Sequence, residues 1–201
     1  MNLKEYNIVK NYNYYDYCEY LQNKYGLPPK PYYTATIKTV NRKYNSRTNE
    51  GLYIHHVYEF DFPHLSQKEV AQEHDYEYQM PSHLCYCDYL EHLLLHTMIT
   101  EGTGRNSDGV EEFMIPELLH IYEINPYAED NSWRMNVSNK IINDKEVFLE
   151  IVKRYVPYIE DQQKFIDNII TGMEEFDLKD GLSNFFIDFT NLFSKNLQVN
   201  F

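Results

Sequence analysis

Histidines stand at spacings that could build a metal site within residues 55–96. His55 and His56 are adjacent, and His92 and His96 lie four residues apart. Side chains four apart on a helix project from the same face, and this spacing suits two ligands of one metal ion. His55, His92 and His96 can therefore meet around one divalent metal ion, which leaves His56 beside the metal as a base.

The alternation of a strand separates the two adjacent histidines. His55 and His56 come near the end of an apolar stretch, Leu52–Val57, that we predict to be a β-strand. Neighbouring side chains of a strand point to opposite faces, so a metal ion on one face is readily reached by only one of the two. The other imidazole is then free to act on a water molecule.

The second histidine pair requires a helix with a defined start. Asp88 stands where a helix N-cap is expected, and Glu91 follows three residues later, which is the pattern of a capping box. We predict the helix over residues 89–100 and a short strand, Leu84–Cys87, directly before it. The sequence thus predicts two strands followed by a helix, with histidines on the first strand and on the helix.

Hydrophobic spacing and the positions of glycine and proline predict the other elements. In the first half we expect a helix at Tyr12–Tyr25, a strand at Tyr32–Val40, a polar loop at 41–51 and a short helix at 66–73. The glycine-rich stretch Gly102–Gly109 is the clearest break in the chain. After the break, Pro116 interrupts residues 110–124, and helices are predicted near 144–156, 160–172 and 182–195.

These elements predict an α+β chain in two parts. Residues 1–101 contain the two strands and the histidine helix, preceded by an N-terminal helix and strand. Residues 110–201 form an acidic, mostly α-helical region without a catalytic constellation. We find no internal repeat.

The charge of the chain is strongly negative and unevenly spread. The net charge is −13, yet residues 1–50 carry 8 basic and 4 acidic side chains, while the rest of the chain carries 10 basic and 27 acidic ones. An acidic surface repels a polyanion. A nucleic-acid partner would therefore need a metal ion or the basic N-terminal quarter to offset the repulsion.

Cysteine content and hydropathy indicate a cytoplasmic protein. Cys18, Cys85 and Cys87 are odd in number and include a Cys-x-Cys pair, which argues against a disulfide framework and favours small buried residues in a reducing compartment. No apolar run reaches the roughly 18–20 residues that cross a bilayer, and the N-terminus has no apolar signal segment. We expect no membrane partner.

Residues 50–100 resemble the HNH nucleases, whose ββα-metal fold holds one divalent cation between two strands and a helix. The residues that carry the resemblance are His55-His56, the Leu84–Cys87 strand, and Glu91-His92 with His96. By this resemblance His55, His92 and His96 take the metal-ligand positions, and His56 takes the position of the general base. The resemblance implies a bacterial or phage-encoded endonuclease that hydrolyses DNA with Mg²⁺, Mn²⁺, Ni²⁺ or Zn²⁺.

One position departs from the family pattern. The residue nine before the first helix histidine is usually an asparagine that orients the loop carrying the base, and here it is His83. A histidine can donate one hydrogen bond and accept another, so His83 could substitute for it in the active site; it could also mark a site whose activity has drifted. The interval from His56 to His83 is also longer than in compact members. Its acidic stretch, 73–77, is expected to be a solvated loop.

Two other functions fit the same residues. The chain could keep an HNH-like fold without cleavage and act as a phage or mobile-element inhibitor, binding a nucleic-acid enzyme through the acidic surface of its helical region. The histidine cluster could instead be a structural zinc site, closed by a fourth ligand such as His83 or Cys85.

Overall fold

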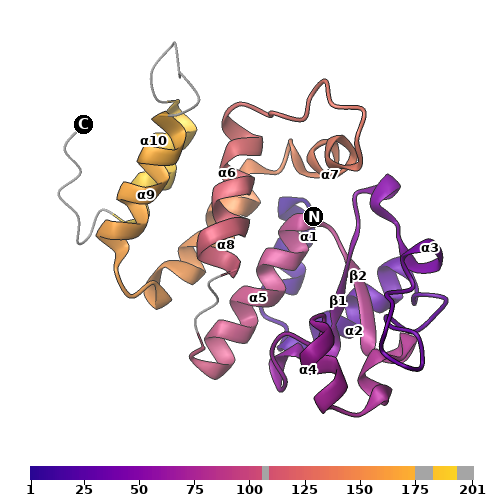
Figure 1. Cartoon of the computed structure of the whole chain (residues 1–201). Helices are drawn as coiled ribbons and strands as arrows, with labels where there is room; N and C mark the ends of the chain where they lie inside the picture. The colour runs from indigo at the N-terminus through magenta and orange to yellow at the C-terminus, as the bar shows by residue number, and fades with distance from the viewer. Residues whose placement is uncertain (106–108, 175–182, 194–201) are drawn as a thin grey trace.

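The computed structural model describes residues 1–105, 109–174 and 183–193. Over these residues the protein is a mixed α/β structure, with one small antiparallel sheet lying among helices (Figure 1). None of the described helices has the length and apolar character needed to cross a membrane. The α-helices are α1 (Leu3–Val9), α2 (Tyr14–Tyr25), α3 (Arg42–Asn45), α4 (Lys68–Glu73), α5 (Tyr89–Thr103), α6 (Ile115–Glu123), α7 (Trp133–Ile141), α8 (Lys145–Tyr155), α9 (Gln162–Glu174) and α10 (Asn184–Asn191).

The sheet has two strands, β1 (Tyr53–His56) and β2 (Leu84–Cys87), as the sequence predicted. They pair antiparallel, with His55 opposite Cys85 and His56 opposite Leu84. Helix α2 packs on β2, and α5 begins directly after that strand. The histidines of β1 and of α5 are therefore brought to one region of the molecule.

The predicted strand at Tyr32–Val40 is wrong. Only an isolated bridge joins Tyr33 to Val40, and the chain between them turns back on itself, with Ile37 at a positive φ of 51°. Tyr33 and Ile37 are buried against Ala71 in a small second core. In a strand Tyr33, Ala35 and Ile37 would share one face, but Ala35 is exposed and Ile37 N–H closes a turn on the Thr34 carbonyl at 2.7 Å, so tertiary packing overrode the β-branched character of the segment.

The helical predictions agree with the structure, with four additions. Helices α2, α4, α5, α8, α9 and α10 lie where the sequence placed them, and residues 182, 194 and 195 of the last predicted helix lie outside the described residues. Helices α1, α6 and α7 were not predicted, and α3 with a 3₁₀ turn at Thr48–Glu50 occupies the expected loop at 41–51. Pro116 does not break its segment: a π-helical turn, Val110–Met114, runs directly into α6 just ahead of it, with Ile115 N–H bonded to the Val110 carbonyl, and this wider turn accommodates the proline.

One hydrophobic core runs through both halves of the chain. Helix α5 packs against α8, and Leu93, Leu94, Phe148 and Ile151 of these two helices are all fully buried. They belong to a single cluster that extends from α1 to α10. The division of the chain at residues 101–110 stays a prediction.

Candidate metal centre

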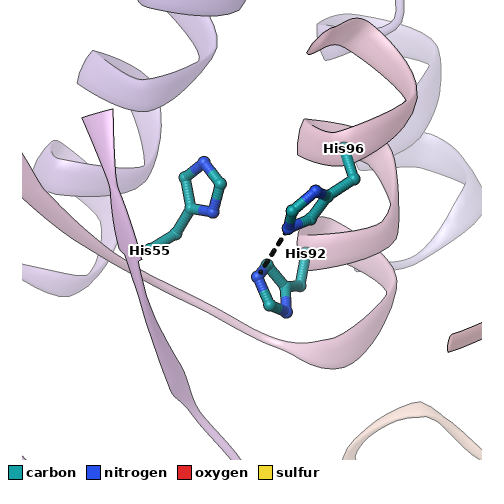
Figure 2. Close-up of side chains that lie close together, drawn as sticks. All are labelled: His55, His92 and His96. Carbon is teal, nitrogen blue, oxygen red and sulfur yellow. Dashed lines mark hydrogen bonds between the residues drawn. The ribbon is translucent and has the colours of Figure 1, made fainter. Parts of the chain in front are cut away.

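Three histidines converge beside the sheet. His55 points from β1 toward His92 and His96, which project from successive turns of α5 (Figure 2). Taking one ring nitrogen from each residue, these atoms lie within 4.8 Å of one another. The structure thus brings together the three residues that the sequence predicted as metal ligands, and this cluster could hold a metal ion.

The separation of the two helix histidines fits a shared ion. Nε2 of His92 lies 3.2 Å from Nε2 of His96. Nitrogens bound tetrahedrally at about 2.0–2.1 Å from one zinc ion lie about 3.4 Å apart. The two rings therefore need only a small adjustment to bind the same ion.

The hydrogen bonds of Tyr14 define which nitrogen His55 offers. The Tyr14 hydroxyl donates to the backbone carbonyl of His56 (3.2 Å) and lies 2.8 Å from Nε2 of His55. Because the carbonyl can only accept, the single hydroxyl proton is used there, and the hydroxyl must accept from Nε2–H of His55. Nδ1 of His55 then carries the lone pair, and this buried atom has no hydrogen-bond partner. A buried lone pair without a partner is what a metal ligand requires before the metal binds.

The surroundings keep the three rings neutral. Burial and the neighbouring imidazoles hold the pKa of His55 and of His92 well below the usual value. Burial, with a smaller contribution from His64, lowers the pKa of His96 to about 4. Neutral imidazoles are the form that binds metal, so the site can accept an ion at neutral pH without first losing protons.

Glu59 is a neighbour of this cluster that the sequence reasoning did not identify. Its Oε2 lies 3.6 Å from Nδ1 of His55, and its side chain is largely buried. Burial raises the pKa of Glu59 to about 7, against the opposing effects of the His64 backbone N–H and of Arg105. The signal that could have found it is its position four residues after His55, at the start of the connection to β2.

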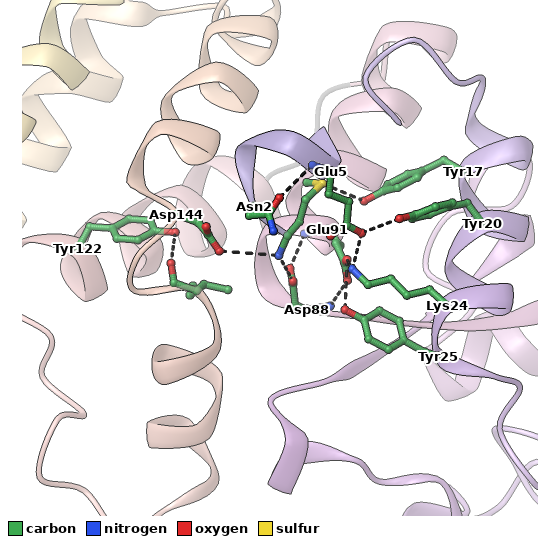
Figure 3. Close-up of polar contacts among 12 residues, drawn as sticks. Asn2, Glu5, Tyr17, Tyr20, Lys24, Tyr25, Asp88, Glu91, Tyr122 and Asp144 are labelled. Carbon is green, nitrogen blue, oxygen red and sulfur yellow. Dashed lines mark hydrogen bonds and ion pairs between the residues drawn. The ribbon is translucent and has the colours of Figure 1, made fainter. Parts of the chain in front are cut away.

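Charged groups hold the start of α5, and Figure 3 shows their arrangement. The predicted capping box is present: Glu91 N–H donates to Asp88 (2.8 Å), and Asp88 N–H donates to Glu91 (2.7 Å). Lys24 of α2 pairs with the fully buried Glu91 at 2.6 Å, and the Met1 ammonium pairs with Asp88. These contacts tie the histidine helix to α2 and to the first residue of the chain.

His56 lies on the opposite face of β1, as the alternation of a strand predicts. Its side chain is buried, with Nε2 at 3.0 Å from Oε1 of Gln79 and the ring against Tyr32. Burial lowers the pKa of His56 to about 4, while the Gln79 hydrogen bond opposes that shift. The ring is therefore neutral at pH 7.

His83 is at the rim of the same region. Its ring packs edge-on to Tyr58, two residues beyond His56, and Nε2 lies 3.6 Å from Glu77. The side chain of His83 therefore contacts the segment that follows His56, the residue predicted to be the general base. Glu73, Asp75 and Glu77 are exposed, so the acidic stretch is solvated as predicted, but Glu73 ends α4 and Glu77 lies in a 3₁₀ turn, so the stretch is not a simple loop.

The ligand group is limited to three residues over the part of the chain that the structure describes. Cys85 faces His55 across the sheet, but its thiol is hydrogen-bonded to Cys18, which together with burial raises the pKa of Cys85 well above its usual value. Neither Cys85 nor His83 joins the ligand group among these residues, which favours an open site over a closed one. No protein-family model, curated protein or solved structure matches this chain.

Proposed function

We propose that the protein is a metal-dependent endonuclease that hydrolyses DNA phosphodiester bonds, with β1, β2 and α5 forming an HNH-like ββα-metal core. The observation that carries the proposal is the convergence of three neutral imidazoles, those of His55 on β1 and of His92 and His96 on α5. A fourth histidine, His56, directly follows His55 and lies on the other face of β1. An antiparallel strand pair followed directly by the helix is the order that the resemblance requires.

The ligands would be Nδ1 of His55 together with His92 and His96. Three imidazoles suit Zn²⁺ or Ni²⁺ better than Mg²⁺ or Mn²⁺, which prefer oxygen ligands. A bound ion would stabilise the charge that develops on the phosphate and on the leaving oxygen. The carboxyl group of Glu59, whose Oε2 lies 3.6 Å from Nδ1 of His55, would hold a water molecule at the site.

In this proposal His56 is the general base. As the oxygen of a water molecule forms its bond to phosphorus, the imidazole takes the water proton, and the bond from phosphorus to the leaving oxygen breaks. His56 is only 1% exposed and is covered by Tyr32 and Gln79. The proposal therefore requires that DNA binding moves the segment over His56.

An exposed aromatic residue supports a nucleic-acid substrate. Trp133 is 43% exposed and packs edge-on to Tyr53, whose ring in turn stacks on His92. The guanidinium group of Arg134 lies over the Trp133 ring, 5.7 Å from its centre. An exposed indole with an adjacent arginine can stack on a base and pair with a phosphate, which suits a splayed or single-stranded segment near the metal.

The test is plasmid nicking by purified, metal-stripped protein after addition of Mn²⁺, Ni²⁺ or Zn²⁺. Wild type is expected to nick DNA, and His56→Ala is expected to bind metal without nicking. Absence of cleavage by wild type with every metal, at full metal occupancy, would refute the nuclease proposal.

A second candidate is the non-cleaving interaction protein, which one surface feature favours. A pocket of about 570 Å³ between α6 and α9 is lined by four carboxylates, by Lys164 and by apolar residues that include Leu119 and Phe165; the carboxylates are Glu111, Glu112, Glu160 and Asp161. This candidate predicts salt-sensitive binding of a basic polypeptide such as polylysine, weakened in Glu112→Gln/Glu160→Gln and unchanged in His56→Ala.

A further inference from the structure

We propose that Gln79 is the positioning residue that sets the tautomer and the ring orientation of His56. This inference rests on the proposed function, because it concerns the residue assigned there as the general base. Gln79 ends a 3₁₀ turn, Tyr76–Gln79, and its side chain is fully buried. It is separated from His56 by 23 positions in the sequence and does not occupy the position where the family has its asparagine.

The hydrogen bonds of Gln79 determine which end of its amide faces the histidine. Nε2 of Gln79 donates to the backbone carbonyl of Leu65 at 3.2 Å, and Oε1 faces Nε2 of His56 at 3.0 Å. The reversed amide would set two oxygens against each other at Leu65, since a carbonyl can only accept. The amide orientation is therefore fixed by the backbone of Leu65.

The tautomer of His56 follows from that orientation. Because Oε1 of Gln79 can only accept, Nε2 of the neutral imidazole must carry the proton. The lone pair is then on Nδ1, which is the atom able to take a proton from water. Gln79 thus does for His56 what Tyr14 does for His55: it accepts the Nε2 proton and leaves Nδ1 basic.

Gln79 also holds the cover of His56. Its backbone carbonyl accepts a hydrogen bond from Tyr32 N–H at 2.7 Å, and the Tyr32 ring lies edge-on to His56 at 4.7 Å between ring centres. One residue therefore aligns the imidazole through its side chain and anchors the aromatic residue over it through its backbone. A fully buried glutamine is costly unless its polar atoms are used, and both of its amide atoms have partners here.

The experiment compares two variants of Gln79 with a matched control. Gln79→Met keeps the length of the side chain and removes the acceptor, whereas Gln79→Glu, protonated in this buried position, keeps an acceptor for Nε2–H of His56 and a donor for the Leu65 carbonyl. The control is Gln22→Met, because Gln22 also bonds backbone carbonyls, those of Ser82 and Leu84, without contacting His56. The readouts are kcat and KM for DNA, metal affinity, and the ¹⁵N ring shifts of His56, which report its tautomer.

In Gln79→Met we expect kcat to fall about 10–100-fold with KM and metal affinity unchanged, because the groups supporting a functional histidine have effects of this size. Gln79→Glu is expected to restore most of kcat, and the control is expected to keep kcat. The wild-type ¹⁵N shifts should show a proton on Nε2 of His56, and Gln79→Met should show a mixture of tautomers.

The spectrum separates this inference from the nuclease proposal. If wild type cleaves no DNA but its His56 carries the proton on Nε2 and loses that preference in Gln79→Met, the positioning role stands and the nuclease function fails. A proton on Nδ1 of wild-type His56, or an unchanged kcat in folded Gln79→Met, would overturn the positioning role.

Discussion

The two faces of β1 give the two adjacent histidines different surroundings. On one face, His55 meets His92 and His96, and its Nδ1 has no hydrogen-bond partner. On the other face, His56 is enclosed by Gln79 and Tyr32. Both rings are neutral at pH 7, but only the first has further imidazoles within reach of a shared ion. An imidazole is thus suited to bind a metal ion or to accept a proton, depending on the residues that pack beside it.

The largest expected effect is on metal binding and cleavage, at the face of β1 that carries His55. His92→Ala should abolish stoichiometric binding of one metal ion and lower nuclease activity by about 10⁴-fold, or about 5.5 kcal/mol of transition-state stabilisation. Elemental analysis and plasmid nicking measure the two effects. His120→Ala, at the acidic pocket between α6 and α9, is the control and should leave both unchanged. Full metal occupancy in His92→Ala would disprove the ligand assignment.

The second effect concerns the His56 face alone. His56→Ala should lower kcat by about 10³-fold, because it removes a general base, and should leave metal affinity unchanged. Single-turnover cleavage and metal titration give the two values. Loss of metal binding in this variant would mean that the two faces are not independent.

Stability of the metal-free protein should depend on pH through both faces. The pKa values of His55, His56, His92 and His96 are lowered by folding, so between about pH 4 and the usual value of 6.5 the unfolded chain binds more protons and stability rises with pH. Glu59 and Glu91, each with a pKa raised to about 7, act in the opposite direction. The four histidines outweigh the two carboxyl groups.

We therefore expect the free energy of unfolding to fall by about 3 kcal/mol between pH 7 and pH 5. Urea unfolding in the presence of EDTA at the two pH values measures it. In His92→Ala/His96→Ala the dependence should reverse or vanish, since only two of the four histidines then oppose the carboxyl groups. An equal pH dependence in that variant would show that other groups control it.

A smaller effect is expected where α5 is anchored, outside both faces. Lys24→Met leaves the fully buried Glu91 without its lysine partner, and should lower the free energy of unfolding by about 2 kcal/mol. For a chain of this size that corresponds to about 4–8 °C in Tm. Lys10→Met, which removes an exposed contact to Asn7, should change Tm little. Equal Tm values for the two variants would contradict the anchoring role.

The smallest effect tests how His55 is held. Tyr14→Phe removes the acceptor of the Nε2 proton, and should weaken metal binding about 10-fold while kcat at saturating metal stays close to wild type. Tyr15→Phe is the matched control, because the Tyr15 hydroxyl bonds Asp61 and not a histidine. Metal titration with a competing chelator distinguishes them.

Local spacing was enough to predict the elements that carry the candidate site. The capping box of Asp88 and Glu91 located the start of α5, and alternation separated His55 from His56. The same reasoning failed at Tyr32–Val40. Its β-branched residues are typical of a strand, but Tyr33 and Ile37 are buried in a second small core. That outcome depended on Ala71, whose approach no local pattern encodes.

The sequence by itself determined the chemical groups and the element on which each one lies: a histidine pair on a strand, another on a helix, and a cap between them. The tertiary structure decided which nitrogen of each ring is free. Tyr14 reaches His55 across 41 positions of sequence, and Gln79 reaches His56 across 23. Local periodicity orients a side chain only relative to its own element, whereas its hydrogen-bond partners depend on how distant segments pack.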